Sequence, residues 1–359
     1  MEEQKVVVSQ ENCKSESYAK SIKQRTFGLD LIRLFASLFT IAGHFFSLNT
    51  PFRTTTFEGT SMFLQAMGHM FFKGTPFFML LSGYLLVNKV FDSKYYYRGK
   101  KVIIAYLFFS VLTIFFRKYY LEESLSWLQW GSKILDYSAI PYAWYIEMWI
   151  GLFLLSPFLN IMYHSITSKK RKQLLLLILF SLSCLPLLTN RYGLYLIPQY
   201  WKNCYPLFFY FMGAYIKEYT PVINRYRGIA IILIICLINP VFNLLFVKDH
   251  TLIQIAGDPA GAFGVLLSVT LFLLLYKVDI SNDKLKSAIS YIAQRSLSIY
   301  LCCYIFDALY YPWFKERCFI SQSQFGIFFF VIVPLVFLSS LVVAQMKEWL
   351  FKLFKVIHF

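Results

Sequence analysis

The sequence predicts an all-α integral membrane protein with about ten transmembrane helices and with both termini in the cytosol. Of its 359 residues, 58% are hydrophobic and only 15% are Asp, Glu, Lys or Arg, too few charges to cover a soluble protein of this size. Apolar stretches of roughly 20 residues, the length that crosses about 30 Å of hydrocarbon, recur along the chain. The net charge of +16 fits the basic cytosolic loops of such a protein.

The elements follow from these stretches in chain order. Residues 1–25 are polar and charged and contain no apolar segment beside a small-residue cleavage site, so they predict a disordered cytosolic tail. Residues 26–359 predict a single polytopic membrane domain. The predicted spans are 27–48, 66–88, 101–116, 143–163, 173–190, 203–217, 228–247, 258–276, 292–311 and 325–346.

The distribution of basic residues sets the predicted orientation. Most of the 35 Lys and Arg residues fall in the tail and in the connections on the same side as the tail. The outer connection 117–142, with Trp127 and Trp130, is expected at the membrane interface. We therefore expect a multi-pass protein of the cytoplasmic membrane with lipid as a partner. Because topology accounts for the basic runs, no nucleic-acid partner is predicted.

The cysteines predict neither a disulfide framework nor a metal site. Their number is odd, no two are separated by two residues, and most lie in apolar runs, where a thiol behaves as a small hydrophobic group. They are Cys13, Cys184, Cys204, Cys236, Cys302, Cys303 and Cys318.

The first span contains three ionisable residues, each a candidate for function because a charge inside a bilayer is costly. Arg33 and His44 are separated by eleven positions, which rotate a helix to about 20° past three turns and raise it by roughly 16 Å. They are therefore expected on one face, with a cation near the cytosol and a base deeper in the membrane. The structural alternatives are a buried histidine bonded to a neighbouring helix and an interfacial Asp30–Arg33 pair.

Residues 29–45, LDLIRLFASLFTIAGHF, resemble the first-helix signature of the integral membrane acyltransferase-3 family, in which an Arg and a His are separated by ten residues. Residues 75–86, TPFFMLLSGYLL, resemble the second helix of the polysaccharide O-acetyltransferase type, with Ser82 and Gly83 at its Ser-Gly positions.

Three later segments extend the resemblance to about residue 310. YYYRGKKVIIAY at 95–106 is similar to the basic start of the third helix. AWYIEMWIGLFLLSPFL at 143–159 resembles the Trp-containing fourth helix, with Tyr142 where a His commonly precedes the Trp. SLSIYLCCYIF at 296–306 resembles a Tyr-Leu-x-His helix in which Cys303 stands at the His position.

The resemblance implies transfer of an acyl group, usually acetyl, from cytosolic acyl-CoA to a hydroxyl of a cell-surface or lipid-linked polysaccharide. Acetyl-CoA is then the donor substrate and no metal is expected. His44 would act as the general base, and Ser82 would donate to the thioester carbonyl or only permit close helix packing. The donor phosphates would be held by Arg33, Lys94, Arg98, Lys100 and Lys101.

The remaining candidates concern the acceptor and the charge beside Arg33. Asp30 would orient Arg33 or simply start the helix. Glu147 would bind acceptor hydroxyls or lie at the outer interface. Trp144, Tyr142 and His69 are further candidates for the acceptor site.

Two other functions remain open. A transporter or flippase of polysaccharide precursors would share the many spans and is expected to show inverted repeats and helix pairs broken by Gly or Pro at the midplane. No convincing repeat is found, and the Pro residues cluster near the ends of spans. A non-catalytic scaffold for envelope assembly is the third possibility.

Overall fold

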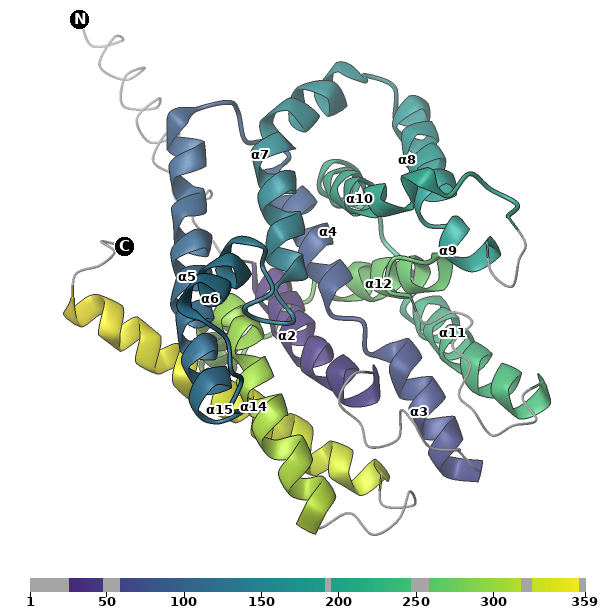
Figure 1. Ribbon diagram of the computed structural model, residues 1–359. Helices are drawn as coiled ribbons and strands as arrows, with labels where there is room; N and C mark the ends of the chain where they lie inside the picture. The colour runs from purple at the N-terminus through teal and green to yellow at the C-terminus, as the bar shows by residue number, and fades with distance from the viewer. Residues whose placement is uncertain (1–25, 48–58, 191–194, 247–257, 318–324, 355–359) are drawn as a thin grey trace, which may run out of the picture.

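The computed structural model describes residues 26–47, 59–190, 195–246, 258–317 and 325–354, and this part of the chain contains helices and no strand (Figure 1). The predicted tail, 1–25, lies outside the described residues. The helices are α2 (Phe27–Ser47), α3 (Gly59–Phe71), α4 (Thr75–Leu86), α5 (Ser93–Tyr119), α6 (Trp127–Leu135), α7 (Trp144–Ser165), α8 (Lys169–Ser183), α9 (Pro186–Thr189), η1 (Tyr200–Cys204), α10 (Tyr205–Tyr219), α11 (Arg225–Phe246), α12 (Ala262–Leu275), α13 (Asp283–Ala293), α14 (Ser296–Arg317) and α15 (Phe325–Leu353).

Six of these helical segments are long and apolar enough to cross a membrane, which confirms a multi-pass membrane protein in outline. The apolar α12 is shorter, so the count of about ten spans and the cytosolic termini remain predictions. Ile103, Leu107, Val111 and Phe115 form an exposed stripe along α5, as expected for side chains that face lipid. The six segments are Phe27–Phe46, Ser93–Tyr119, Trp144–Ser165, Lys169–Thr189, Arg225–Leu245 and Gly326–Leu353.

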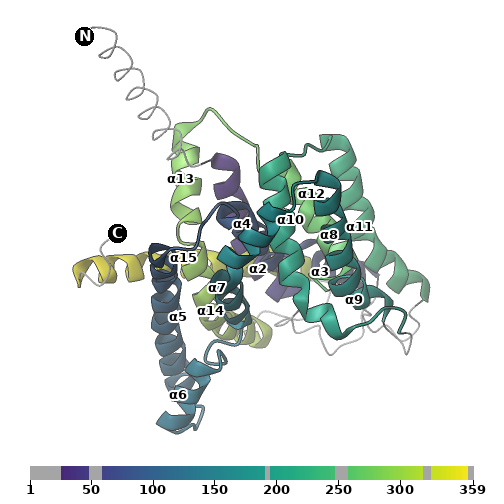
Figure 2. The same ribbon diagram turned by 90° about the horizontal axis from the view of Figure 1, so that it is seen from above.

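The helix α2 lies in the middle of the molecule and contacts α3, α4, α12, α13, α14 and α15. Both views place α5 and α6 on one side of it and α8 and α11 on the other (Figures 1 and 2). A side chain on α2 can therefore meet residues from distant parts of the sequence.

The prediction of one continuous span at 66–88 is wrong. The chain forms α3 and α4, and residues 72–74 between them carry the buried Lys73. Gly74 packs so closely on α2 that an added Cβ would overlap Thr40, and an added Cβ on Gly43 would lie 2.7 Å from the carbonyl oxygen of Phe72. The hydropathy pattern does not reveal this break, because both α3 and α4 are apolar.

Small residues let α4 and α10 approach each other backbone to backbone. A Cβ added to Gly83 would overlap the carbonyl oxygen of Tyr210, and one added to Gly213 would overlap that of Leu80. This is the close packing that small residues permit in membranes.

Two predicted connections contain more helix than expected. The basic residues 94–101, predicted as a loop that opens a span, form the first turns of α5, whose N-cap is Asp92. The outer connection contains α6, which begins with a capping box formed by Ser126 and Gln129. Polar side chains that accept hydrogen bonds from the free N–H groups at a helix start thus let the helix begin before its apolar stretch.

Candidate functional site

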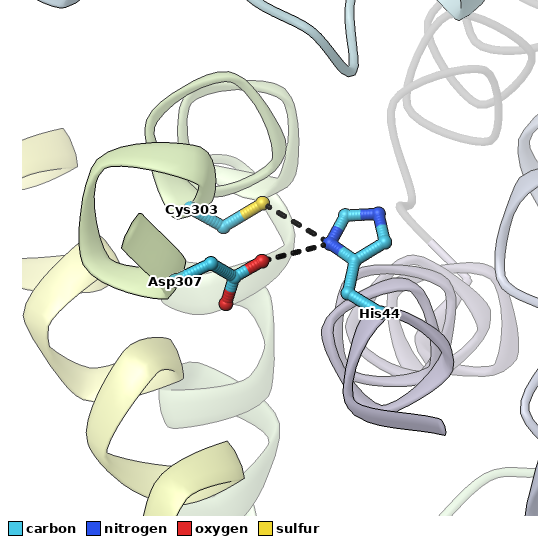
Figure 3. Close-up of side chains that lie close together, drawn as sticks. All are labelled: His44, Cys303 and Asp307. Atoms are coloured by element: carbon cyan, nitrogen blue, oxygen red, sulfur yellow. Dashed lines mark hydrogen bonds and ion pairs between the residues drawn. The ribbon is translucent and has the colours of Figure 1, made fainter. Parts of the chain in front are cut away.

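The predicted base His44 is buried on α2 and faces α14 (Figure 3). Its Nδ1 lies 3.2 Å from Oδ2 of Asp307 and 3.9 Å from Sγ of Cys303. Asp307 follows Cys303 by one helical turn, so both side chains face α2 from the same side of α14. The three side chains form a buried cluster of imidazole, carboxylate and thiol.

Tyr142 joins this cluster from the connection before α7. Its hydroxyl donates to Asp307 Oδ2 at 3.0 Å, and the centroid of its ring lies 3.9 Å from that of His44. Tyr300 donates a hydrogen bond to the carbonyl oxygen of Tyr142. Tyr142, predicted as an acceptor-site residue, is therefore placed against the candidate base.

The geometry of the pair assigns roles to the two nitrogens of His44. When Asp307 is ionised its carboxylate only accepts hydrogen bonds, and Nδ1 of His44 is then the nitrogen that carries the shared proton. The other nitrogen, Nε2, points away from α14 and is left with the lone pair of a base (Figure 3). The negative charge on Asp307 would stabilise the imidazolium that forms when Nε2 takes a proton.

The other two charged residues of α2 form a pair near its start. Nη1 of Arg33 donates to Oδ1 of Asp30 at 2.6 Å, and the Asp30 side chain is buried while that of Arg33 is partly exposed. Both candidates are thus brought together, with Asp30 orienting the guanidinium. Because Asp30 lies three positions before Arg33 on one continuous helix, local geometry fixes the pair.

Arg33 lines a cavity of about 260 Å³ between α2, α4, α5, α7 and α14. Ser82 also lines it, and its hydroxyl donates to the carbonyl oxygen of Phe78 at 2.9 Å. Val102 of α5 and Tyr300 of α14 are further wall residues. The cavity wall thus contains Arg33 and Ser82, the candidates for binding the acyl donor, together with Tyr300. The hydroxyl of Tyr300 is hydrogen-bonded to the main chain of Tyr142.

The basic residues of α5 lie beside this cavity and not within it. All four are exposed at the start of the helix, and the next residue, Val102, belongs to the cavity wall. Lys100 Nζ lies 5.3 Å from the centroid of the Tyr97 ring. The four residues are Lys94, Arg98, Lys100 and Lys101.

The other acceptor candidates are separated from His44. Trp144 and Glu147 are exposed on α7, whereas Tyr145 and Ile146 on the same helix line the cavity. His69 is buried at the end of α3, where its Nδ1 lies 3.4 Å from Lys73 Nζ. Trp144 and Glu147 therefore lie on an exposed edge of α7, and His69 belongs to a buried basic pair with Lys73.

Sequence reasoning missed Asp307. It lies within the predicted span 292–311 and is an acid in an apolar helix, the same signal that selected Asp30 and His44. Its pairing with His44 links positions that are 263 residues apart, which spacing within one helix does not reveal.

The cluster also contains the atom types of a metal site, because one donor atom each from His44, Cys303 and Asp307 lie within 4.8 Å of one another. Imidazole, thiolate and carboxylate are all ligands of Zn²⁺. In the metal-free arrangement the hydrogen bonds of His44 and Tyr142 both end on Asp307 Oδ2. The prediction that no metal is required therefore stays a prediction.

The described helices thus hold a buried imidazole–carboxylate pair and a cavity with a cation at its wall. A family model described as Acyltransferase domain matches residues 26–345, and the chain belongs to this acyltransferase-3 family. No curated protein and no solved structure gives a match. The family confirms acyl transfer in general and leaves donor, acceptor and residue roles to be argued from the site.

Proposed function

We propose that this protein transfers an acetyl group from cytosolic acetyl-CoA to a hydroxyl of a cell-surface or lipid-linked polysaccharide, at the cytoplasmic membrane. The observation that carries the proposal is the His44–Asp307 pair, which Tyr142 and Tyr300 link to the wall of a cavity that reaches Arg33. A base, a group that fixes its tautomer and a space for an extended substrate are the requirements of acyl transfer to a hydroxyl.

The cytosolic part of the site would bind the donor. Arg33 at the cavity wall and the exposed Lys94, Arg98 and Lys101 are placed to contact phosphates, and guanidinium groups do so in bidentate fashion. The cation and the base stand on one helix with roughly 16 Å of rise between them, a span comparable with an extended pantetheine arm. Ser82, on the cavity wall, would donate to the thioester carbonyl after its hydroxyl turns from Phe78.

The chemical step follows from the roles of the two imidazole nitrogens. Nε2 of His44 takes the proton of the acceptor hydroxyl while that oxygen forms a bond to the thioester carbon. The carbon–sulfur bond then breaks, and the CoA thiolate leaves and receives the proton from the imidazolium. Asp307 holds the imidazolium through Nδ1, and Tyr142 donates to the same carboxylate oxygen.

The acceptor would approach from the outer half of the membrane. Trp144 and Glu147 on the exposed edge of α7, and the buried His69, stay proposed contacts for sugar hydroxyls. Trp144 and Glu147 lie in the first turn of α7, just after Tyr142, whereas His69 lies near the end of α3. Tyr142 itself, at 3.9 Å from the His44 ring, is the proposed acceptor contact closest to the base.

The test combines a cellular and a purified measurement. A deletion strain is complemented with wild type, His44→Ala or Arg33→Ala at equal membrane abundance, and O-acetyl groups on the surface polysaccharide are measured by NMR. Purified protein is supplied with labelled acetyl-CoA. We expect acetylation to return with wild type alone. His164→Ala is the matched control. His164 lies on α7 and not on α2, and it contacts the carbonyl oxygen of Val87 at 2.9 Å. This variant should acetylate normally.

One observation favours a second function. The break between α3 and α4, with Gly74, Pro76 and the buried Lys73, is the kind of interrupted helix found in transporters. Transport of a polysaccharide precursor predicts that deletion lowers the amount of exported polymer while the remaining polymer keeps normal acetylation. A scaffold predicts loss of assembly that His44→Ala restores as well as wild type does.

A further inference from the structure

The connection from α5 to α7 is held by the buried Arg117, near the end of α5. Its Nε and Nη2 donate to the two carboxylate oxygens of Glu123, each at 2.9 Å. Its Nη1 donates to the carbonyl oxygens of Ser138 and Ala139, each at 3.0 Å. We name this set of residues the Arg117 clamp: Arg117, Glu123, Ser138 and Ala139.

The clamp is internal to the fold and is not a binding site for an anion. A guanidinium has five N–H donors, and at Arg117 four hydrogen bonds go to two side-chain and two main-chain oxygens of the protein. Its charge is neutralised by Glu123, and it lies 5.2 Å from the centroid of the Trp130 ring, which is buried. A planar guanidinium that makes two parallel hydrogen bonds to one carboxylate fixes the orientation of the two side chains as well as the distance between them.

The clamp ends three residues before the candidate site. After Ala139 the chain enters the core at Ile140, and the amide of Ala143 donates to the carbonyl oxygen of Ile140 at 2.9 Å. Tyr142 lies within this tight turn. The path from Nη1 of Arg117 to Tyr142 is therefore a short stretch of main chain, in which Ala139, Ile140 and Tyr142 are buried and Pro141 is exposed.

The opposite side of Tyr142 is fixed by α14. Tyr300 donates to its carbonyl oxygen, and its ring meets the Tyr304 ring edge to face at 5.4 Å between centroids. Its main chain thus has two supports, one from α14 and one from α5 through Arg117. Removal of either support would let the hydroxyl of Tyr142 leave Asp307.

We propose that Arg117 is a positioning residue for acyl transfer, which acts by holding Tyr142 against His44 and Asp307. This inference rests on the proposed function. Arg117 donates to Glu123, Ser138 and Ala139, which lie outside the wall of the donor cavity, so its loss should lower kcat and leave the KM for acetyl-CoA within about twofold. The expected loss of kcat in Arg117→Ala is about tenfold.

The decisive experiment is a double-mutant cycle on the purified full-length protein with labelled acetyl-CoA. The variants are Arg117→Ala, Tyr142→Ala and the combination, each with its melting temperature measured. If Arg117 acts through Tyr142, the combined variant is no slower than Tyr142→Ala by more than about twofold. A combined loss equal to the product of the two single losses would overturn the proposal. Where Tyr142→Ala does not fold, Tyr142→Phe takes its place with the same expectation.

A second measurement separates this inference from the proposed function. Hydrogen exchange of the peptide around residues 138–146 should speed up in Arg117→Ala and stay at the wild-type rate in Lys118→Ala. Lys118 is the matched control, because it is the next residue and its Nζ lies over the Trp127 ring at 3.8 Å, away from the clamp. Unchanged exchange in Arg117→Ala would contradict positioning, whereas absence of acetyl transfer by wild type would contradict the proposed function alone.

Discussion

Nδ1 of His44 and Oδ2 of Asp307 lie 3.2 Å apart and connect the central α2 to α14. The pair is buried on both sides, and a carboxylate bonded to one ring nitrogen fixes the orientation of the imidazole.

Asp307→Asn should lower kcat by roughly a hundredfold or more and leave the KM for acetyl-CoA nearly unchanged. The amide keeps the shape of the side chain but cannot stabilise the imidazolium. The measurement is steady-state acetyl transfer by purified protein, with Asp279→Asn as the control, because Asp279 forms a surface ion pair with Lys286 at 2.8 Å. Equal kcat in Asp307→Asn and wild type would remove Asp307 from the mechanism.

Cys303→Ser should retain activity within about threefold, because the thiol donates to the carbonyl oxygen of Tyr300 at 3.1 Å, and a hydroxyl can do the same. No labelled acetyl group should stay on the protein after acid quenching of the reaction. A labelled protein that loses its label in Cys303→Ser would instead establish a covalent acyl-enzyme at this residue.

Removal of metal should not change activity. Oδ2 of Asp307 and Sγ of Cys303 already lie 3.2 Å and 3.9 Å from Nδ1 of His44, within hydrogen-bonding reach. We expect full acetyl transfer after dialysis against a strong zinc chelator and no zinc in stoichiometric amount by elemental analysis. Loss of activity that added Zn²⁺ restores would assign the cluster to a metal.

Arg33→Ala should raise the KM for acetyl-CoA about tenfold or more, the size expected when a charged hydrogen bond to the donor is lost. Arg98→Ala should act in the same direction. Lys284→Ala is the control, because Lys284 is an exposed lysine on α13 outside the cavity wall. If Arg98→Ala changes membrane association but not the KM, the α5 cluster binds lipid headgroups and not the donor.

Gly83→Ala should reduce the melting temperature and the amount of folded protein, because the new methyl group would overlap the carbonyl oxygen of Tyr210 and force α4 away from α10. Such overpacking typically costs about 1–3 kcal/mol. Gly151→Ala adds the same methyl group on α7 where no atom lies within 4 Å, and it should leave the melting temperature unchanged or higher.

Helical periodicity was sufficient to predict the relation of Arg33 and His44, because both lie on one unbroken helix. It also predicted the approximate position of most helices, since about 20 apolar residues are needed for each span. The family resemblance was confirmed over residues 26–345.

The rest of the site depends on contacts between distant segments. The packing of Tyr142 on His44 joins a connection to α2, and the pairing with Asp307 joins α14 to α2, so neither follows from the pattern of one helix. Asp307 is an acid within an apolar span, a signal that could have marked it as unusual, but the prediction did not include it. The break at 72–74 depends on how closely Gly74 approaches α2, which is a property of tertiary packing.

The continuity of α2 also makes this helix a molecular ruler. Arg33 and His44 are carried by the same rigid rod, so the distance between the group proposed to bind the donor and the proposed base cannot adjust to donors of different length. One residue inserted between them would advance His44 by about 1.5 Å and turn it by about 100°, away from Asp307. The spacing within one helix would thereby define which part of a threaded thioester comes to rest at the base.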